Sequence, residues 1–245
     1  MKLIPMGQGL GDHLAVTAFV REFKKKWPEE LVMVDSHRYP FVWDHNPRIN
    51  WGKEEMLGTI QINHKRFEDM GNMPTQMCAD LGFLPADTRP EIFLTERECG
   101  YGKLALTGLP QGLKKVAMDY HATGIDRRWP LVRFQELAKL LQARRIVIVE
   151  IGNNLPMLAS DRALSKHLHV RQTAAILKEC DLYVGNDSGS FHLAASVGIR
   201  QVVLFGPTKS KSFAYESTSP FDKFWDVYPP AVASKVFELL ETDNS

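Results

Sequence analysis

The chain has little cysteine, no long apolar run and almost no net charge, and each absence argues against a class of protein. Its three cysteines, Cys78, Cys99 and Cys180, lie far apart with no paired spacing, so they indicate neither a disulfide framework nor a zinc site. The sequence contains no run of apolar residues long enough to span a membrane, and its apolar N-terminal stretch is too short for a signal peptide. The formal net charge of +1 gives no support for nucleic-acid binding by overall charge. We therefore expect a cytoplasmic protein without a transmembrane segment.

The pattern of apolar residues predicts an α/β protein. The chain has 245 residues, of which 44% are hydrophobic and 24% are charged, so it can bury a substantial core. Short apolar runs alternate with longer segments of helical periodicity, which is typical of parallel strands joined by helices. The expected strands are 2–6, 31–35, 57–62, 91–95, 114–120, 144–152, 182–185 and 201–206, and the expected helices are 12–27, 75–83, 130–142, 170–181, 189–198 and 230–241.

A glycine-rich stretch divides this pattern into two halves. Residues 98–114 combine several glycines with Pro110 and are interpreted as a linker. We therefore predict two Rossmann-like lobes with parallel sheets, one over 1–105 and one over 113–228. The remaining residues, 229–245, carry a helix that is placed to pack back on the N-terminal lobe.

The stretch from Tyr183 to Ser196, YVGNDSGSFHLAAS, joins a strand to a helix through a polar turn. The free N–H groups at such a helix start suit a phosphate. Gly189 would let the phosphate approach, Ser188 adds a hydroxyl, and His192 lies one turn further along the same face. In a structural interpretation, Asp187 or Ser188 merely caps the helix. A nucleophilic triad of Ser188, His192 and Asp187 is less favoured, because neighbours on one turn do not align as a relay.

The N-terminal turn GQGLGDHL contains Gly9, Gly11 and Asp12 and also follows a strand. It resembles a dinucleotide-binding turn, but Asp12 stands where the last glycine of that motif is required, and its carboxylate would repel a pyrophosphate. The signal for NAD is therefore weak. Asp12 is either a catalytic base in a cleft or a helix cap.

Three blocks of the sequence resemble one enzyme family. YVGNDSGSFHLAASVGIRQVVLFGPT, GLGDHLAVTAFVREFKKKWP and DRRWPLVRFQELAKLL are similar to signatures of glycosyltransferase family nine, the lipopolysaccharide heptosyltransferase family. They occur in the family's order and cover about the first 30 residues and nearly all of 115–208. Thr17-Ala18-Phe19 replaces the family's usual Pro-Ala-Leu, and Tyr120 and His121 replace small residues. The N-terminal lobe is also shorter than is usual in the family.

The resemblance implies a GT-B fold and an inverting sugar transfer without a metal or a cofactor. Asp12 would be the general base, and Arg127, Ser188, Gly189 and His192, with Asp187 beside them, would meet the donor diphosphate. The sequence has no Asp-x-Asp pair to hold a divalent ion. The implied donor is a nucleotide-sugar, ADP-linked with a heptose, and the acceptor is a surface glycan or glycolipid. Glu150, Gly152 and Asn153, after a predicted strand, are the expected nucleotide contacts.

Other functions remain open at this stage. The chain could be a nucleotide-sugar-binding module without activity, although such a module has no need of Asp12. An NAD-dependent oxidoreductase is disfavoured by the same residue, and a nucleotide-sugar epimerase would not account for the three ordered blocks. The basic run Lys24-Lys25-Lys26 could meet the inner face of a membrane or simply form a solvated helix end. The sequence does not define an oligomeric state.

Overall fold

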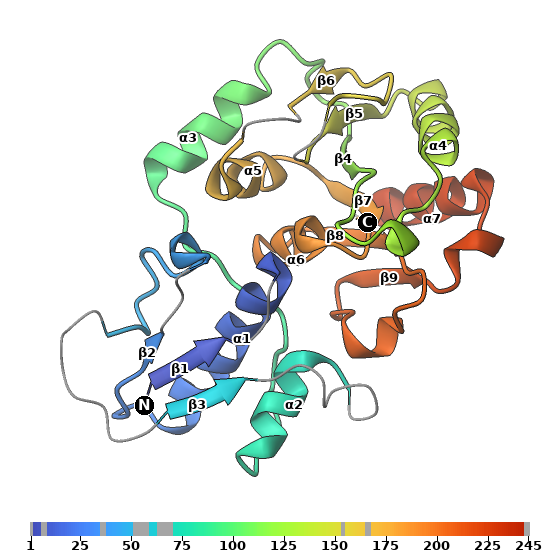
Figure 1. The fold of residues 1–245 in the computed structure, drawn as a ribbon. Helices are drawn as coiled ribbons and strands as arrows, with labels where there is room; N and C mark the ends of the chain where they lie inside the picture. Colours follow the sequence, from blue (N-terminus) through green and yellow to red (C-terminus); the bar gives the residue numbers. More distant parts are fainter. Residues whose placement is uncertain are drawn as a thin grey trace.

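Two separate parallel sheets organise the chain, as the sequence predicts (Figure 1). A computed structural model describes residues 2–5, 9–34, 38–50, 59–62, 71–152, 155–164 and 168–242, with 2–5 and 59–62 described by their backbone alone. The three-stranded sheet has the order β2-β1-β3, and the six-stranded sheet has the order β6-β5-β4-β7-β8-β9. Their strands are β1 (Lys2–Pro5), β2 (Met33–Val34), β3 (Thr59–Ile62), β4 (Lys115–Asp119), β5 (Val147–Glu150), β6 (Arg162–Ala163), β7 (Leu182–Asn186), β8 (Arg200–Leu204) and β9 (Thr218–Phe221).

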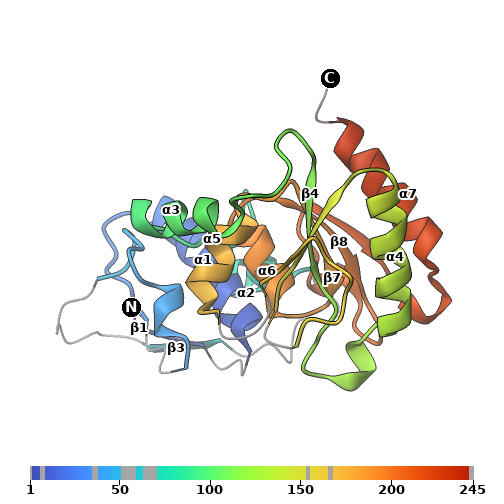
Figure 2. The same ribbon diagram turned by 90° about the horizontal axis from the view of Figure 1, so that it is seen from above.

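Helices cover both faces of the larger sheet. Seen from above, α4 and α7 lie on one side of it, and α5 and α6 lie on the other (Figure 2). The helices are α1 (Leu10–Lys26), α2 (Met73–Asp80), α3 (Glu96–Ala105), α4 (Leu131–Ala143), α5 (Val170–Leu177), α6 (Gly189–Ser196) and α7 (Pro229–Glu241). Short 3-10 turns are η1 (Pro40–Val42), η3 (Ile125–Arg127), η4 (Ser210–Ser212) and η5 (Phe224–Asp226). None of the helices in the described parts of the chain is long and apolar enough to cross a membrane.

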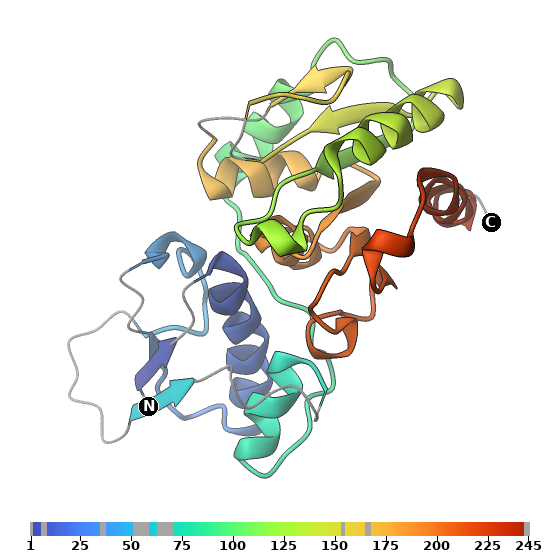
Figure 3. The ribbon, with the colours of Figure 1, turned by 45° about the vertical axis from the view of Figure 1, so that its right-hand side comes forward.

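One hydrophobic core runs through both lobes. Leu14 and Phe19 of α1 belong to the same buried cluster as Ala117 of β4 and Phe191 of α6. A second cluster fills the opposite face of the six-stranded sheet, under α4 and α7. Because α1 packs directly against α6, the N-terminal ends of these two helices come together at one end of the shared core (Figure 3).

The predicted linker is wrong. Residues 96–105 form α3, which begins with a capping box in which Thr95 N–H donates to Glu98 Oε2 at 2.8 Å. The helix packs on α5 of the C-terminal lobe. Gly102 is not a helix breaker here, because it lets α3 approach α5 so closely that a Cβ at this position would overlap the Ala175 carbonyl.

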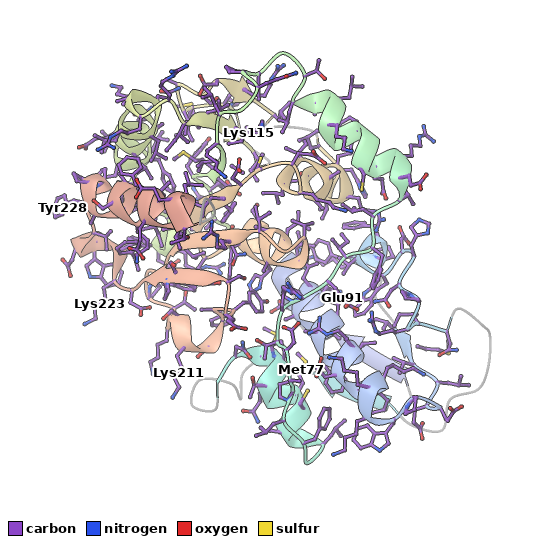
Figure 4. All side chains as sticks on the ribbon, turned by 180° about the vertical axis from the view of Figure 1, so that it is seen from behind. Met77, Glu91, Lys115, Lys211, Lys223 and Tyr228 are labelled. Atoms are coloured by element: carbon purple, nitrogen blue, oxygen red, sulfur yellow. The ribbon has the colours of Figure 1, made fainter. Side chains whose placement is uncertain are left out.

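Further elements differ from the prediction, which did not include β6 and β9. Residues 91–95 form no strand. They belong to a connector that runs from α2 to α3 and is held by Arg21 of α1, whose guanidinium donates to the Arg89 and Asp87 carbonyl oxygens at 2.8 and 2.7 Å. Glu91 of this connector pairs with both Arg21 and Arg48 (Figure 4). The C-terminal helix α7 packs on α4 and β8 of the larger sheet, not on the N-terminal lobe, because its apolar face completes the second core cluster.

Candidate functional site

A cavity of about 550 Å³ opens where the starts of α1 and α6 converge. Both helices direct their free N–H groups toward it, and this arrangement favours an anion. The N-terminal lobe and the C-terminal lobe both contribute to its lining, which consists of Gly9, Leu10, Gly11, Asp12, Arg38, Tyr39, Thr123, Arg127, Asp187, Ser188, Gly189, His192, Thr208 and Phe213. The predicted catalytic residue and all five predicted phosphate-binding residues are therefore brought together in one place.

The turn before α6 presents a hydroxyl that has no hydrogen-bond partner. Ser188 is the N-cap residue of α6, yet its side chain makes no capping hydrogen bond. Its Oγ is buried and has no hydrogen-bond partner among the described residues. Buried polar atoms are rarely left unpaired unless they serve a ligand or water. The purely structural role of Ser188 as a cap is thus not the one that the geometry favours.

Asn186 holds this turn against the turn that follows β4. Its Oδ1 accepts from Trp129 N at 2.9 Å, and its Nδ2 donates to the Tyr120 carbonyl at 2.8 Å. These bonds place Arg127, two residues before Trp129, next to Asp187. The Arg127 Nη1 lies 3.6 Å from Asp187 Oδ2, and the Arg127 side chain is 35% exposed. Arg127 is therefore anchored at the cavity wall without being fully neutralised.

Burial raises the pKa of the Asp187 carboxyl, while the Thr208 hydroxyl and the Arg127 guanidinium lower it. The net direction is upward, because removal of the carboxylate from water outweighs these two partners. An anionic ligand that drew Arg127 away would raise this pKa further. Asp187 therefore pairs with the cation of the site, Arg127. It is not the helix cap that the sequence also allowed, because Ser188 is the N-cap residue of α6.

His192 is buried and neutral. Its Nδ1 shares a 2.6 Å hydrogen bond with the Tyr215 hydroxyl, and burial, assisted by Arg127, lowers the pKa of the imidazole to about 3. A neutral imidazole has one accepting and one donating nitrogen. When the Tyr215 hydroxyl donates its hydrogen bond to Nδ1, the ring proton is therefore on Nε2. The Nε2 edge of the ring faces Gly11 at the start of α1.

Asp12 lies in the first turn of α1 and combines two functions. Its Oδ2 accepts from Gly9 N at 2.9 Å, so the capping interpretation is correct as far as it goes. The same residue also lines the cavity, together with Arg127 and Ser188. A carboxylate that is held in place by its own helix end beside an anion site is a candidate for the general base that the sequence predicts.

The three predicted nucleotide contacts have different surroundings. Glu150 is fully buried, and its carboxylate accepts from Met157 N, Leu158 N and Ser160 Oγ at 2.7 to 3.2 Å. It holds the segment after β5 and lines neither of the two cavities beside Ser188 and Gly189. Gly152 does line the smaller of these cavities. Asn153 lies outside the described residues.

Several residues of the site had no clear signal in the sequence. Arg38 and Tyr39 come from the segment after β2 and line the larger cavity. Thr208 ends the quoted stretch Phe205-Gly206-Pro207-Thr208 and could have been found from it. Asp119, the last residue of β4, is buried beside the smaller cavity. The lysine run in the last turn of α1 lies at the other end of that helix from the cavity: Lys24 Nζ donates to the Pro28 carbonyl, and Lys25 pairs with Glu22.

Comparisons with known proteins agree with this geometry. A family model described as glycosyltransferase family 9 (heptosyltransferase) matches residues 84–223. Lipooligosaccharide heptosyltransferase 2 of Campylobacter jejuni subsp. jejuni serotype O:2 is 29% identical over 127 residues, which are 46% of this chain and 38% of that protein. The match thus spans less than half of the length of this relative.

Solved structures share the fold over nearly the whole chain. An ADP-heptose lps heptosyltransferase II from E. coli has a TM-score of 0.75 at 16% identity, with 100% of this chain and 99% of the other covered. A glycosyl transferase family 9 protein from Veillonella parvula DSM 2008 has a TM-score of 0.81 at 16% identity, with coverage of 98% and 97%. The predicted fold class, α/β with two Rossmann-like lobes, is confirmed.

Proposed function

Because the chain belongs to glycosyltransferase family 9, the heptosyltransferase family, we propose that it transfers a sugar, a heptose, from an ADP-sugar to a lipopolysaccharide-type acceptor. The observation that carries this proposal is the cavity that Asp12 lines together with Arg127 and Ser188, whose hydroxyl has no hydrogen-bond partner among the described residues. The relatives are named as heptosyltransferases, and the E. coli neighbour's name specifies ADP-heptose, which supports this donor.

The donor diphosphate binds at the start of α6. The backbone N–H groups after Ser188 and the Ser188 hydroxyl donate to its oxygens, and Arg127 supplies the positive charge. A Cβ added at Gly189 would lie 3.1 Å from the Leu10 Cβ. A side chain at position 189 would therefore narrow the space between the lobes. The neutral His192 contributes a hydrogen-bond donor without adding charge.

Asp12 takes the proton from the acceptor hydroxyl while that oxygen attacks the anomeric carbon. The bond from that carbon to the diphosphate breaks at the same time, and the leaving group takes the bonding electrons. Arg127 and the N-terminus of α6 stabilise the developing charge on the diphosphate. Attack from the side opposite the leaving group inverts the anomeric centre.

The reaction, as proposed, needs no metal ion and no cofactor besides the nucleotide-sugar. The charge of the diphosphate is met by protein groups in the cavity, namely Arg127 and the helix N–H groups, with Arg38 also at the wall. We place the reaction on the cytoplasmic face of the membrane, where a nucleotide-sugar is available to a glycolipid acceptor.

A transfer assay tests the proposal. Purified protein is incubated with ADP-heptose and a deacylated lipopolysaccharide core, with and without EDTA, and the release of ADP is followed. Acceptor-dependent ADP release that persists in EDTA and is lost in Asp12→Asn is the expected result. Binding of ADP without any transfer would instead identify a nucleotide-sugar-binding module.

A further inference from the structure

A second cavity adjoins the first along the Ser188-Gly189 turn. It measures about 260 Å³ and lies between the ends of β4 and β5 and the starts of α5 and α6. The two cavities share Leu10, Tyr39, Thr123, Ser188 and Gly189, and the smaller one is lined in addition by Asp119, His121, Ala122, Gly152, Leu168, Val170, Thr173, Ser190 and Leu193. A ligand whose phosphates occupy the larger cavity can therefore extend directly into the smaller one.

The polar floor of this cavity is the carboxylate of Asp119. The residue is 4% exposed. Its Oδ2 accepts from the Ser190 hydroxyl at 2.6 Å, and its Oδ1 accepts from His121 N at 3.0 Å. A carboxylate can accept about four hydrogen bonds, so roughly half of its capacity is uncommitted. Ser190 belongs to the first turn of α6, which ties the carboxylate to the same helix end that holds the phosphate.

Gly152 keeps one side of this carboxylate uncovered. Its φ is +114°, a conformation that residues with a side chain rarely adopt, and a Cβ at this position would lie 2.7 Å from Asp119 Oδ1. Any other residue at position 152 would cover that oxygen. Glycine therefore serves two needs at once: the turn after β5 and access to Asp119.

The charge around Asp119 excludes a phosphate from the smaller cavity. Burial, with a smaller contribution from the Glu150 carboxylate, raises the pKa of Asp119 to about 6. In the described parts of the chain no lysine or arginine pairs with Asp119, and the nearby Arg128 instead contacts His121 Nε2 at 2.8 Å. A neutral group that donates hydrogen bonds, such as a sugar hydroxyl, fits this environment, whereas an anion does not.

We infer that Asp119 recognises a hydroxyl pair of the nucleotide-sugar donor in the smaller cavity. This inference rests on the proposed function. The hydroxyls belong either to the ribose of the nucleotide or to the sugar that is transferred, and their chemistry at Asp119 is the same. Ser190 and Gly152 are positioning residues, because the first orients the carboxylate and the second leaves room beside it.

The test compares ligands with and without these hydroxyls. Binding of ADP, 2′-deoxy-ADP, 3′-deoxy-ADP and ADP-glucose is measured by calorimetry for the wild-type protein, Asp119→Asn and Ser190→Ala. Loss of a hydrogen bond to a carboxylate predicts a weakening of roughly 10- to 100-fold in Asp119→Asn, with a smaller effect in Ser190→Ala. Asp181→Asn is the matched control. The Asp181 carboxylate accepts from Lys115 N at the start of β4, whereas Asp119 is at the end of the same strand.

The pattern of losses identifies the source of the hydroxyls. If they come from the ribose, ADP binds more weakly to Asp119→Asn, and removal of the matching ribose hydroxyl has little additional effect in that variant. If they come from the transferred sugar, only ADP-glucose is weakened. Equal affinities of the wild-type protein and Asp119→Asn for every ligand would overturn the inference but leave the proposed function standing. Failure of the wild-type protein to bind any of them would overturn both.

Discussion

Gly11 of α1 packs so closely against the imidazole of His192 in α6 that a Cβ at position 11 would overlap the ring. His192 cannot easily move aside, since it is buried and bonded to Tyr215. This contact sets the separation of the two helix starts. It thereby brings Asp12, the next residue, to the edge of the phosphate-binding turn.

Gly11→Ala should separate the catalytic groups while the protein stays folded. We expect turnover to fall about 100-fold, as is typical of a displacement of about 1 Å at a reacting centre, with a loss of about 1–3 kcal/mol in the free energy of unfolding. Turnover is followed as ADP release, and stability by urea titration. The control is Gly100→Ala in α3, where nothing lies within 4 Å of an added Cβ, and it should be active and slightly stabilised. Wild-type turnover in Gly11→Ala would show that this contact does not position Asp12.

Asp12→Asn separates catalysis from donor binding. An asparagine can still accept from Gly9 N and cap α1, but it cannot take a proton. We expect kcat to fall roughly 10²- to 10⁴-fold, while the affinity for ADP stays unchanged or becomes tighter, because a negative charge facing the phosphates is removed. Single-turnover kinetics and ADP titration distinguish the two effects. Near-normal turnover in this variant would assign the base to another residue.

Asp119→Asn should stabilise the protein at neutral pH. The folded pKa of about 6 is above the ordinary value of 3.8, so the folded protein binds this proton more tightly than the unfolded chain does. Stability contributed by the protonated carboxyl is therefore lost as the pH rises from about 4 to 6, amounting to about 2–3 kcal/mol. The variant should have a higher Tm than the wild-type protein at pH 7.5, and the difference should vanish near pH 4. An equal difference at both pH values would contradict this account.

The position of Asp119 in a ligand cavity explains why the protein keeps a carboxylate that lowers its stability at neutral pH. Residues that lower stability where they stand are typical of ligand sites, because function and stability impose different demands. A gain of stability that accompanies a loss of donor affinity is therefore the result expected for Asp119.

Arg171 of α5 is the main polar tie between the lobes. Its guanidinium contacts both carboxylate oxygens of Glu98 and donates to the Phe41 carbonyl at 3.0 Å and to the Phe93 carbonyl. Arg171→Met should cost about 1–3 kcal/mol at pH 7, because it leaves a carboxylate and two part-buried carbonyls without their partner.

The pH dependence of this loss follows from Glu98. Its interaction with Arg171 lowers the Glu98 pKa from 4.5 to about 2, so the stability it contributes is present above pH 4.5 and is lost as the pH falls toward 2. Urea unfolding of Arg171→Met should therefore differ less from the wild-type protein at pH 3 than at pH 7. Arg97→Met, at an exposed position of α3, should behave like the wild-type protein at both pH values.

Much of the fold could be predicted because periodicity and burial agree in most of the chain. Except for the two-residue edge strand β6, the strands and helices from 114 to 206 were found from apolar runs, since both faces of the larger sheet are covered. The error at α3 arose because Gly100 and Gly102 were taken as breakers. The Thr95-Glu98 capping box was the stronger local signal, and the reason for Gly102 is a contact with α5 that only the fold creates.

The site divides in the same way. Asp12, Ser188, Gly189 and His192 were accessible to sequence reasoning because they stand at helix starts after strands, where ligands gather. Asp119 was not, since its role depends on Gly152 and Ser190, which are distant in the chain and meet it only in the folded state. Arg38 is likewise brought to the cavity by the packing of one lobe on the other.

Calorimetric titration of the purified protein with ADP, UDP, GDP, CMP and NAD tests the central claim most directly. The account predicts that ADP binds with micromolar affinity, that His192→Ala and Arg127→Met weaken this binding at least tenfold through the loss of a charge-assisted or buried donor, and that Asp12→Asn preserves it. Binding of NAD alone, or of none of these nucleotides, would contradict the assignment of the cavity as a nucleotide-sugar donor site.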